Sequence, residues 1–593
     1  MKEHARALPR RRSIAPLVAF LLTAIGAGAA AYGVGCGSSD DETQPPSRRV
    51  SAVDAAGSGE AVANEAPAAN RDEDASPTAK PDTTSTAAAA APTAAPLDAS
   101  YDGPRLGAMA MQTPIYAETR FDDRIGYIRQ GGKVPVDPKP IKKANCKEGW
   151  YRLLEGGYVC GKYSTLDLDN ARVKLGVKQP DVKAVVPYQY AYNLHHGTPL
   201  YKALPTREEM MRYEPYLAEK EREKAKKEAP ASEPSADVAA TGSDRPKGKH
   251  APAEGEDGNV PTTETVDATA AVAAVADIEP ASSAEAPPEP PKAWWQTGEK
   301  KPEVSLSDLE ADADGNLSKR MVKGFFVAVD KSFSWNNRFW YRTTGGLLAP
   351  SDRMVINKPP ETQGVAFPEN AKQIFFALGD KAQKLELSSD GKKVTPKGKL
   401  SKFAAVPLTG KTATIDDATY REAVDGFYVK DSAGTITEPG TRPSDVGEHE
   451  RWVDVNLERK TLVLFEGDKP VYAALISPGK KSRNKKKNHA TPTGSWRIRE
   501  KHIATTMDGD GASGDLPYSI EDVPYVAYFK GSYALHAAFW HNNFGREMSH
   551  GCVNLSPLDA KYVFNFVEPR IPEGWHGVFA TDAKKGSMVV IHE

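Results

Sequence analysis

Alternating apolar and polar positions dominate the C-terminal quarter of the chain. Three segments there read as strands with one buried face, at 452–457, 461–466 and 471–477. Helical spacing of apolar residues appears once, after Ser556-Pro557, at Leu558, Tyr562, Val563 and Phe566. Residues 450–593 are therefore predicted to form a mainly β domain with one short helix.

Shorter β-like segments lie upstream, separated by turn residues. Between residues 101 and 170 they fall at 113–116, 125–128, 133–136, 149–153 and 156–159. The stretch Thr198-Pro199-Leu200-Tyr201 repeats the start of the first of them, Thr113-Pro114-Ile115-Tyr116. It indicates a second start of the same kind of small β domain within 180–228, running into a charged, solvated helix over 208–227. Residues 293–445 are again β-like and form an accessory region.

Two long segments lack the residues that a core needs. Residues 37–100 and 229–292 consist mainly of Ala, Pro, Ser, Thr and acidic residues, with few aromatics. Such segments cannot bury enough apolar surface to fold, so they are predicted to be a disordered tether and a disordered linker. The 593 residues thus hold several folded parts, all mainly β.

Charge and cysteine content exclude several classes of protein. Lys and Arg total 77 and Asp and Glu total 79, a formal net charge of -2. That balance argues against nucleic acid as a partner, which usually requires a basic excess. Four cysteines are too few for a multi-cysteine zinc ribbon or a disulfide scaffold.

The N-terminus predicts export. Arginines at 6 and 10–12 precede an uncharged apolar stretch that ends at Cys36, the layout of a signal peptide over residues 1–36. Gly33-Val34-Gly35-Cys36 resembles a bacterial lipoprotein box, although the family usually has Leu where Gly33 stands. The resemblance implies a lipid on Cys36 and a membrane-anchored chain on the periplasmic side of the envelope. A retained span, a twin-arginine signal or simple secretion are the alternatives, and each also places the chain outside the cytoplasm.

Residues 101–170 resemble a bacterial SH3-like barrel through their "TPIY", "GYI", "GW" and "GGYV" segments. Cys146 and Cys160 flank the strand around Trp150, and in an oxidising compartment they are expected to form a disulfide. Cys552 is then expected to remain a free thiol.

The chemistry concentrates near the C-terminus. His536 is followed by twelve residues and then by Ser549-His550-Gly551-Cys552. A thiol attacks carbonyls as the thiolate, and an imidazole within hydrogen-bond reach can take its proton and return it to a leaving amine. Glycine before the cysteine allows a tight turn that directs backbone amides at a developing oxyanion. The pattern indicates acyl transfer through Cys552.

These residues resemble the L,D-transpeptidase catalytic domain of the YkuD type, over roughly the last 145 residues. The motifs that carry the resemblance are the Ser-His-Gly-Cys turn with Asn554, the lead-in 523–536 and the segment Thr491-Pro492-Thr493-Gly494. It implies Cys552 as nucleophile, His536 as general base and the Gly551 and Cys552 amides as oxyanion donors. It also implies substrate contacts from Ser549, His550, Asn554, Tyr525 and Tyr533. The chain departs from the family at Ala537, where Gly is common, and in its short spacer.

The resemblance implies a substrate and a reaction. Cys552 would acylate on the third residue of a peptidoglycan tetrapeptide stem and pass the acyl group to an amine, giving a 3→3 cross-link. Water as acceptor would make the protein an L,D-carboxypeptidase, and a protein lysine would make it a protein-to-wall attachment enzyme. A wall-binding scaffold with a degenerate catalytic domain is the alternative from another class.

Other interpretations of the same residues were weighed. His536, His541, His550 and Cys552 could hold zinc, but no acidic residue nearby would orient such ligands, so neither metal nor cofactor is expected. Cys552 could also be a buried structural thiol. His541 is expected to be a surface or spacer histidine, and His489 is expected to be solvated. The lysine-rich stretch 480–487 is expected to be a solvated hairpin tip, with contact to anionic glycan strands or wall polymers as the alternative.

Overall fold

The computed structural model describes residues 101–228, 304–311, 315–379, 381–510 and 516–593. The expected signal peptide, lipidation site, tether and linker lie outside these residues. The described chain divides into two compact units, one up to Pro205 and again from Val304 on, the other beginning at Thr206. No helix in the described residues is both long and apolar enough to cross a bilayer.

The second unit contains the predicted charged helix as two helices. These are α2 (Arg207–Tyr213) and α3 (Pro215–Glu228). Thr206 and Glu209 form a capping box that begins α2, because each side chain accepts a hydrogen bond from the other residue's amide. Pro215 explains the break, since a proline disfavours helical geometry in the residue before it.

The first β module occupies residues 105–174. The strand β2 (Gln112–Tyr116) pairs with β3 (Arg124–Arg129) and touches β7 (Tyr158–Cys160), which pairs with β6 (Cys146–Arg152). The other elements are β1 (Arg105–Ala108), β4 (Lys133–Pro135), β5 (Ile141–Lys143), β8 (Ser164–Thr165) and α1 (Ala171–Lys174). A disulfide joins Cys146 to Cys160 beside the buried Trp150. The likeness of this module to an SH3-like barrel stays a prediction.

The second β module is discontinuous in sequence. The strands β9 (Gln189–Asn193) and β10 (Thr198–Tyr201) pair with β12 (Phe326–Trp335) and β11 (Leu317–Met321), respectively. The sheet is completed by β13 (Arg338–Thr343), β14 (Leu348–Pro350) and β15 (Met354–Ile356). The predicted domain boundaries 180–228 and 293–445 therefore do not match the strand pairing. Strands that precede α2 and α3 in the sequence and strands that follow them form one sheet.

A third module has its own seven-stranded sheet. Its strands are β17 (Gln373–Ala377), β18 (Gln383–Leu387), β19 (Val394–Lys399), β20 (Ala405–Ile415), β21 (Ala418–Ala423), β22 (Tyr428–Lys430) and β23 (Gly434–Ile436). The run β20 to β23 repeats the order of β12 to β15: a long strand, a hairpin partner, a short strand, a 3-10 turn and a short strand. A Tyr-Arg pair recurs at 341–342 and 420–421. The two modules are therefore related by internal repetition.

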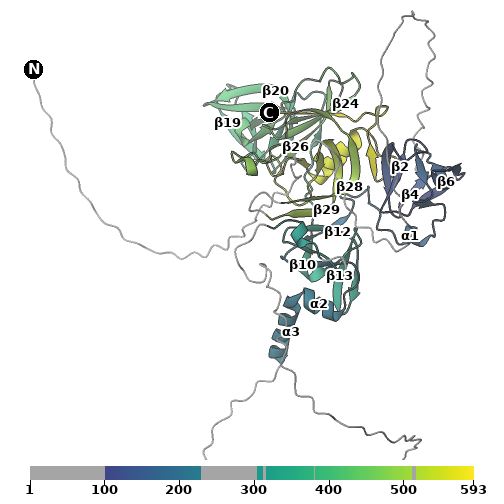
Figure 1. The fold of residues 1–593 in the computed structure, drawn as a ribbon. Coiled ribbons are helices and arrows are strands. Elements are labelled where there is room, and N and C mark those ends of the chain that lie inside the picture. Colours follow the sequence, from purple (N-terminus) through teal and green to yellow (C-terminus); the bar gives the residue numbers. More distant parts are fainter. Residues whose placement is uncertain (1–100, 229–303, 312–314, 380, 511–515) are drawn as a thin grey trace, which may run out of the picture. The chain divides into compact units, whose positions relative to one another are not determined.

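The C-terminal domain is mainly β with one short helix, as predicted (Figure 1). The strands β24 (Arg451–Asn456), β25 (Thr461–Glu466) and β26 (Lys469–Ser477) form a meander, and β26 also pairs with β16 (Val365–Ala366). A second meander joins β28 (Glu500–Gly509), β29 (Tyr518–Lys530) and β30 (Tyr533–Ala537). The remaining strands are β27 (Gly494–Arg497), β31 (Val553–Leu555), β32 (Gly577–Phe579) and β33 (Met588–His592).

The helix α5 (Pro557–Phe566) covers one face of β30 and β31. Ser556 caps it by accepting a hydrogen bond from the Asp559 amide at 3.1 Å, with proline at the first helical position. Val563 and Phe564 of the helix share a buried core with Leu535 and Val553. Because side chains alternate along a strand, the residues between these point to the other face, away from α5.

A buried ion pair ties the first module to the C-terminal domain. Arg129 of β3 donates two hydrogen bonds of 2.9 Å to the carboxylate of Asp522 in β29, which also accepts one from Thr344. Both charged residues are buried. Removing only one partner of such a pair strongly destabilises the protein, because the remaining charge stays buried without its partner.

Replacing Arg129 by Met is therefore expected to lower the free energy of unfolding by about 3–5 kcal/mol. Arg451→Met, which removes the more exposed ion pair with Glu466, is the matched control and should cost about 1 kcal/mol or less. Denaturant unfolding of both variants measures the difference. Equal losses would show that the Arg129 contact contributes no more than a surface pair.

Candidate active site

The register of two parallel strands brings the candidate nucleophile and base to one face. In the pairing of β30 with β31, His536 lies opposite Asn554. Cys552 lies two residues before Asn554, and its Sγ is 3.3 Å from the amide nitrogen of Ala534, two residues before His536. Since residues two apart in a strand share a face, Cys552, Asn554 and His536 all point away from α5.

His536 is fully buried and held in one tautomer. Its Nδ1 lies 3.1 Å from the carbonyl oxygen of Ala537, so Nδ1 carries the proton and donates. Its Nε2 is buried and has no hydrogen-bond partner among the described residues, which leaves a lone pair available. Burial lowers the pKa of His536 to about 4, so the ring is neutral at pH 7. A neutral ring with an available lone pair on Nε2 is able to accept a proton, as a general base must.

Ala537 fulfils the orienting role at the position where Gly is common. It contributes its backbone carbonyl to His536, and its φ is not among the positive values of the described chain. An L-residue therefore fits without backbone strain. The departure from the family pattern leaves the orientation of the base intact.

A network of hydroxyl groups shapes the turn before Cys552. Gly551 has φ of 126°, a conformation that favours glycine. The Ser549 hydroxyl accepts from the Gly551 amide at 3.1 Å and donates to the Cys552 carbonyl at 2.5 Å. Thr491 donates to the Gly551 carbonyl at 2.8 Å and accepts from the Gly479 amide at 2.9 Å. The Thr-Pro-Thr-Gly segment therefore supports the turn from a distance of sixty residues.

This network is inconsistent with the predicted roles of the Gly551 amide and the Ser549 side chain. The Gly551 amide is bonded to Ser549, so it is not the oxyanion donor that the motif implied. The Ser549 side chain is buried, with its donor and acceptor used inside the turn, so it does not contact substrate. Both predictions were wrong because a short motif does not reveal which of its polar groups bond to one another.

The two tyrosines predicted to bind substrate lie in different places, only one of them near the turn. Tyr525 lies in the core beneath α5, and its hydroxyl donates to the Ala184 carbonyl at 3.2 Å. It is therefore not at the site; in the register of β29 with β30 it falls on the face opposite His536. Tyr533 lies at the turn, where a Cβ on Gly551 would come within 2.5 Å of its ring.

Three histidines that the sequence placed in other roles gather near the turn. The His550 ring stacks on Tyr518, with ring centroids 5.6 Å apart, and meets His489 edge-on at 4.2 Å. The expectation that His489 is solvated was wrong. His541, expected at the surface, is partly buried with its Nε2 3.2 Å from the Asn554 side-chain nitrogen. No spacing rule links either residue to the turn, which only the fold brings near.

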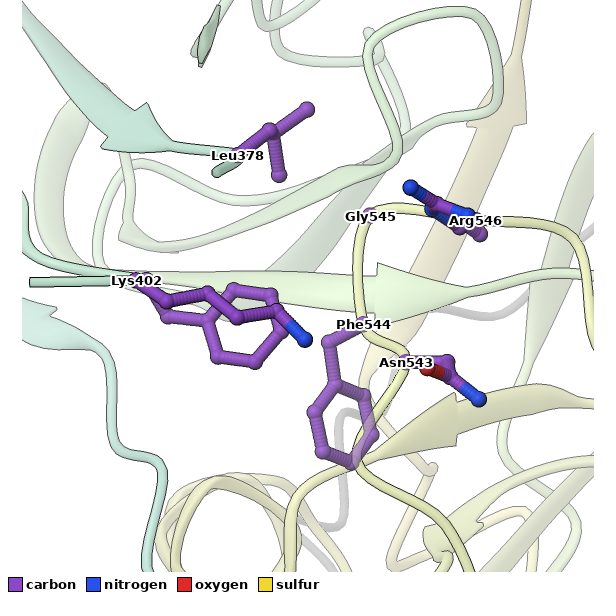
Figure 2. A pocket seen from close by; sticks show the side chains of 7 residues that line it. Leu378, Lys402, Asn543, Phe544, Gly545 and Arg546 are labelled. Carbon is purple, nitrogen blue, oxygen red and sulfur yellow. The ribbon is translucent and has the colours of Figure 1, made fainter. Parts of the chain in front are cut away.

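The loop that follows His541 is anchored on the third module. A pocket of about 130 Å³ lies between them, lined by Leu378, Lys402, Phe403, Asn543, Phe544, Gly545 and Arg546. Figure 2 shows it from close by. Neither His536 nor Cys552 lines it, so it is not the reaction site. Lys402 donates to the Asn542 carbonyl at 3.3 Å, which ties the loop to the module.

Cys552 is disulfide-bonded in this structure. The expectation of a free thiol is therefore wrong for this state. The sulfur of a disulfide is not a thiolate nucleophile, so the chemistry below concerns the reduced form.

Thr491→Val tests the support of the turn. Valine keeps the shape of threonine but leaves the Gly551 carbonyl and the Gly479 amide without a partner, so unfolding should become easier by about 1–3 kcal/mol. Thr493→Val, at an exposed position two residues on, is the control and should change stability by less than about 0.5 kcal/mol. Denaturant unfolding measures both, and equal effects would contradict the role of Thr491.

Comparison with known proteins identifies the domain. Residues 450–591 match the family model named YkuD, the L,D-transpeptidase catalytic domain. No curated protein matches the chain. Similar solved structures include the catalytic domain of an Enterococcus faecium L,D-transpeptidase, at 23% identity over 24% of this chain and 98% of that one, with a TM-score of 0.19.

L,D-transpeptidase 3 of Mycobacterium tuberculosis, in complex with a faropenem-derived adduct, is 18% identical over 32% of this chain and 79% of that one, with a TM-score of 0.19. An L,D-transpeptidase of Stackebrandtia nassauensis is 21% identical over 25% of this chain and 58% of that one, with a TM-score of 0.17. At these scores the structural likenesses support no statement on activity, and the assignment rests on the family model. Residues 450–591 form an L,D-transpeptidase catalytic domain of the YkuD family.

Proposed function

We propose that the chain is a peptidoglycan L,D-transpeptidase that uses Cys552 as its nucleophile. The observation that carries the proposal is the state of His536, whose Nδ1 donates to Ala537 while Nε2 is left as an acceptor on the face of Cys552. A neutral imidazole with a free lone pair beside a thiol is the arrangement that nucleophilic acyl transfer requires. The family of the domain supplies the substrate class.

The first half-reaction forms a thioester. His536 Nε2 takes the proton of the Cys552 thiol, and the sulfur attacks the carbonyl carbon at the L-centre of the third residue of a tetrapeptide stem. A tetrahedral oxyanion forms, for which the Cys552 amide is the proposed backbone donor. When it collapses, the bond to the terminal D-Ala breaks, and the proton on His536 goes to the leaving amine.

The second half-reaction releases the enzyme. An amine of a neighbouring stem attacks the thioester carbonyl, His536 takes its proton, and the sulfur leaves to be protonated again. A 3→3 cross-link is the product. Hydrolysis or attachment to a protein would follow the same steps with water or a lysine as acceptor, because the pocket rather than the nucleophile selects the acceptor.

The proposal is tested by incubating the reduced full chain with disaccharide-tetrapeptide and analysing the products by mass spectrometry. Loss of D-Ala with formation of dimers supports cross-linking. Loss of D-Ala without dimers would replace the proposal by an L,D-carboxypeptidase. Unchanged substrate, with no mass added to the protein, would favour the wall-binding scaffold.

We also propose that the chain acts outside the cytoplasm, held to a membrane by lipid on Cys36. The support is the sequence of residues 1–36. Cys36→Ser should move the protein from the membrane fraction to the soluble fraction or stall its processing, as followed by fractionation and by the mass of the mature N-terminus. A soluble wild-type protein that begins downstream of Cys36 would show ordinary secretion instead.

A further inference from the structure

His541 makes two contacts that together define its protonation. The backbone amide of Asn543 donates to Nδ1 at 3.3 Å, so Nδ1 carries no proton. Nε2 lies 3.2 Å from the side-chain nitrogen of Asn554. Burial, followed by the charges of His536 and Lys480, lowers the pKa of His541 to about 4, so the ring is neutral at pH 7. A neutral imidazole that accepts at Nδ1 carries its proton on Nε2.

This tautomer decides how the Asn554 amide lies. A donor on Nε2 cannot pair with the amide NH2 group, which is also a donor, whereas it pairs with the amide oxygen. The oxygen and nitrogen of an asparagine are distinguished by their hydrogen bonds, and reversing the amide places its oxygen 3.2 Å from His541 Nε2. The same reversal moves the NH2 group to the place of an oxygen that is buried without a partner among the described residues.

The NH2 group then lies on the face that carries the nucleophile. Asn554 is fully buried, pairs with His536 across the strands, and lies two residues after Cys552. Neither this oxygen position nor His536 Nε2 has a hydrogen-bond partner among the described residues. The site therefore holds one unused acceptor, on His536, and one unused donor, on Asn554. A buried donor left unpaired is costly unless a ligand completes it.

We propose that His541 is a positioning residue for acyl transfer: its Nε2–H holds the Asn554 amide so that the NH2 group donates to an oxygen of the stem peptide. The proposal rests on the proposed function and adds a residue that acts through another. His541 does not touch the substrate, and Asn554 does.

The fold holds the loop of His541 from both sides. Asn357 of the second module donates to the Phe539 carbonyl at 2.9 Å, and Tyr190 stacks on the Phe539 ring with centroids 3.8 Å apart. On the other side Thr362 donates to the Asn542 side chain at 2.9 Å. The second module and the segment between β15 and β16 thus hold the loop of His541 on both sides.

The test is a double-mutant cycle on the rate of Cys552 acylation by tetrapeptide substrate, using the reduced full chain. His541→Leu is expected to lose about tenfold, the effect of one buried hydrogen bond. His541→Gln, which keeps a donor near the place of Nε2, should lose about threefold or less. In an Asn554→Ala background, His541→Leu should cost less than about twofold more. Equal losses from His541→Leu in both backgrounds would overturn the proposal.

A second measurement separates this role from help given to the base. The rate of Cys552 alkylation against pH should be the same in wild type and His541→Leu, because the Asn554 amide takes no part in proton removal. A profile shifted by His541→Leu would show that His541 acts through His536, against the proposal.

The same cycle has a readout that does not need turnover. If wild type forms no acyl-enzyme, the proposed function fails, and the unfolding midpoints of the four proteins then decide the inference. Non-additive midpoint losses for His541→Leu and Asn554→Ala support the hydrogen bond between them, and additive losses overturn it.

Discussion

Cys552→Ala should abolish turnover of tetrapeptide substrate, with a loss of at least about 10⁴-fold, while binding of the stem peptide stays measurable. Removing the nucleophile eliminates the thioester on which both half-reactions depend, whereas the groups that recognise the stem remain. Turnover followed by mass spectrometry and binding followed by calorimetry measure the two effects separately. Both proteins are assayed in mild reductant, because Cys552 is disulfide-bonded in this structure.

As a control, the stability of the variant is compared with that of wild type. Alanine replaces one buried sulfur in a domain with an extensive core, so the unfolding midpoint of the variant in reductant should lie close to that of wild type. Turnover above about one hundredth of wild type would show that another group attacks the substrate, and the mechanism would then be wrong.

His536→Gln should lower the rate of acylation by about 10²–10⁴-fold, the usual effect of a general base. Glutamine keeps much of the size and a hydrogen-bonding group but cannot carry a proton back and forth. Because burial lowers the pKa of His536 to about 4, the ring is neutral above about pH 5 and becomes protonated as the pH falls through 4. Wild-type acylation should therefore show no loss from this group between pH 6 and 8.

His550→Gln is the matched control for the base. The His550 ring packs on Tyr518 and His489 beside the turn, so its loss should cost less than that of His536. Losing the base should shift Cys552 alkylation to higher pH, while losing His550 should leave that profile nearly unchanged. A profile shifted by His550→Gln and unaffected by His536→Gln would mean that the two roles are reversed.

Local patterns in the sequence determined the class of this fold. Strand alternation predicted the meander β24 to β26, and Ser556-Pro557 predicted the start of α5, because capping and side-chain alternation depend on neighbours in the chain. The Ser-His-Gly-Cys motif indicated acyl transfer for the same reason: its residues are adjacent. Cys146 and Cys160, expected to pair from their compartment, are bonded in the structure.

Long-range pairing decided the rest. That β9 and β10 share a sheet with strands more than a hundred residues later could not follow from periodicity, which carries no information on partners. The side of β29 on which Tyr525 falls depends on register, and a shift of one residue would reverse it.

The polar contacts of the site were decided by the tertiary structure in the same way. Thr491 reaches the Gly551 carbonyl, and His541 reaches Asn554, only because the segment between β26 and β27 and the loop after β30 approach the turn and β31. The sequence identified which side chains can react, because the chemical reactivity of a side chain follows from its residue type. Which amide is already bonded, which tautomer is held and which donor is left for substrate depend on distances of a few ångströms between distant segments, and only the folded chain sets those.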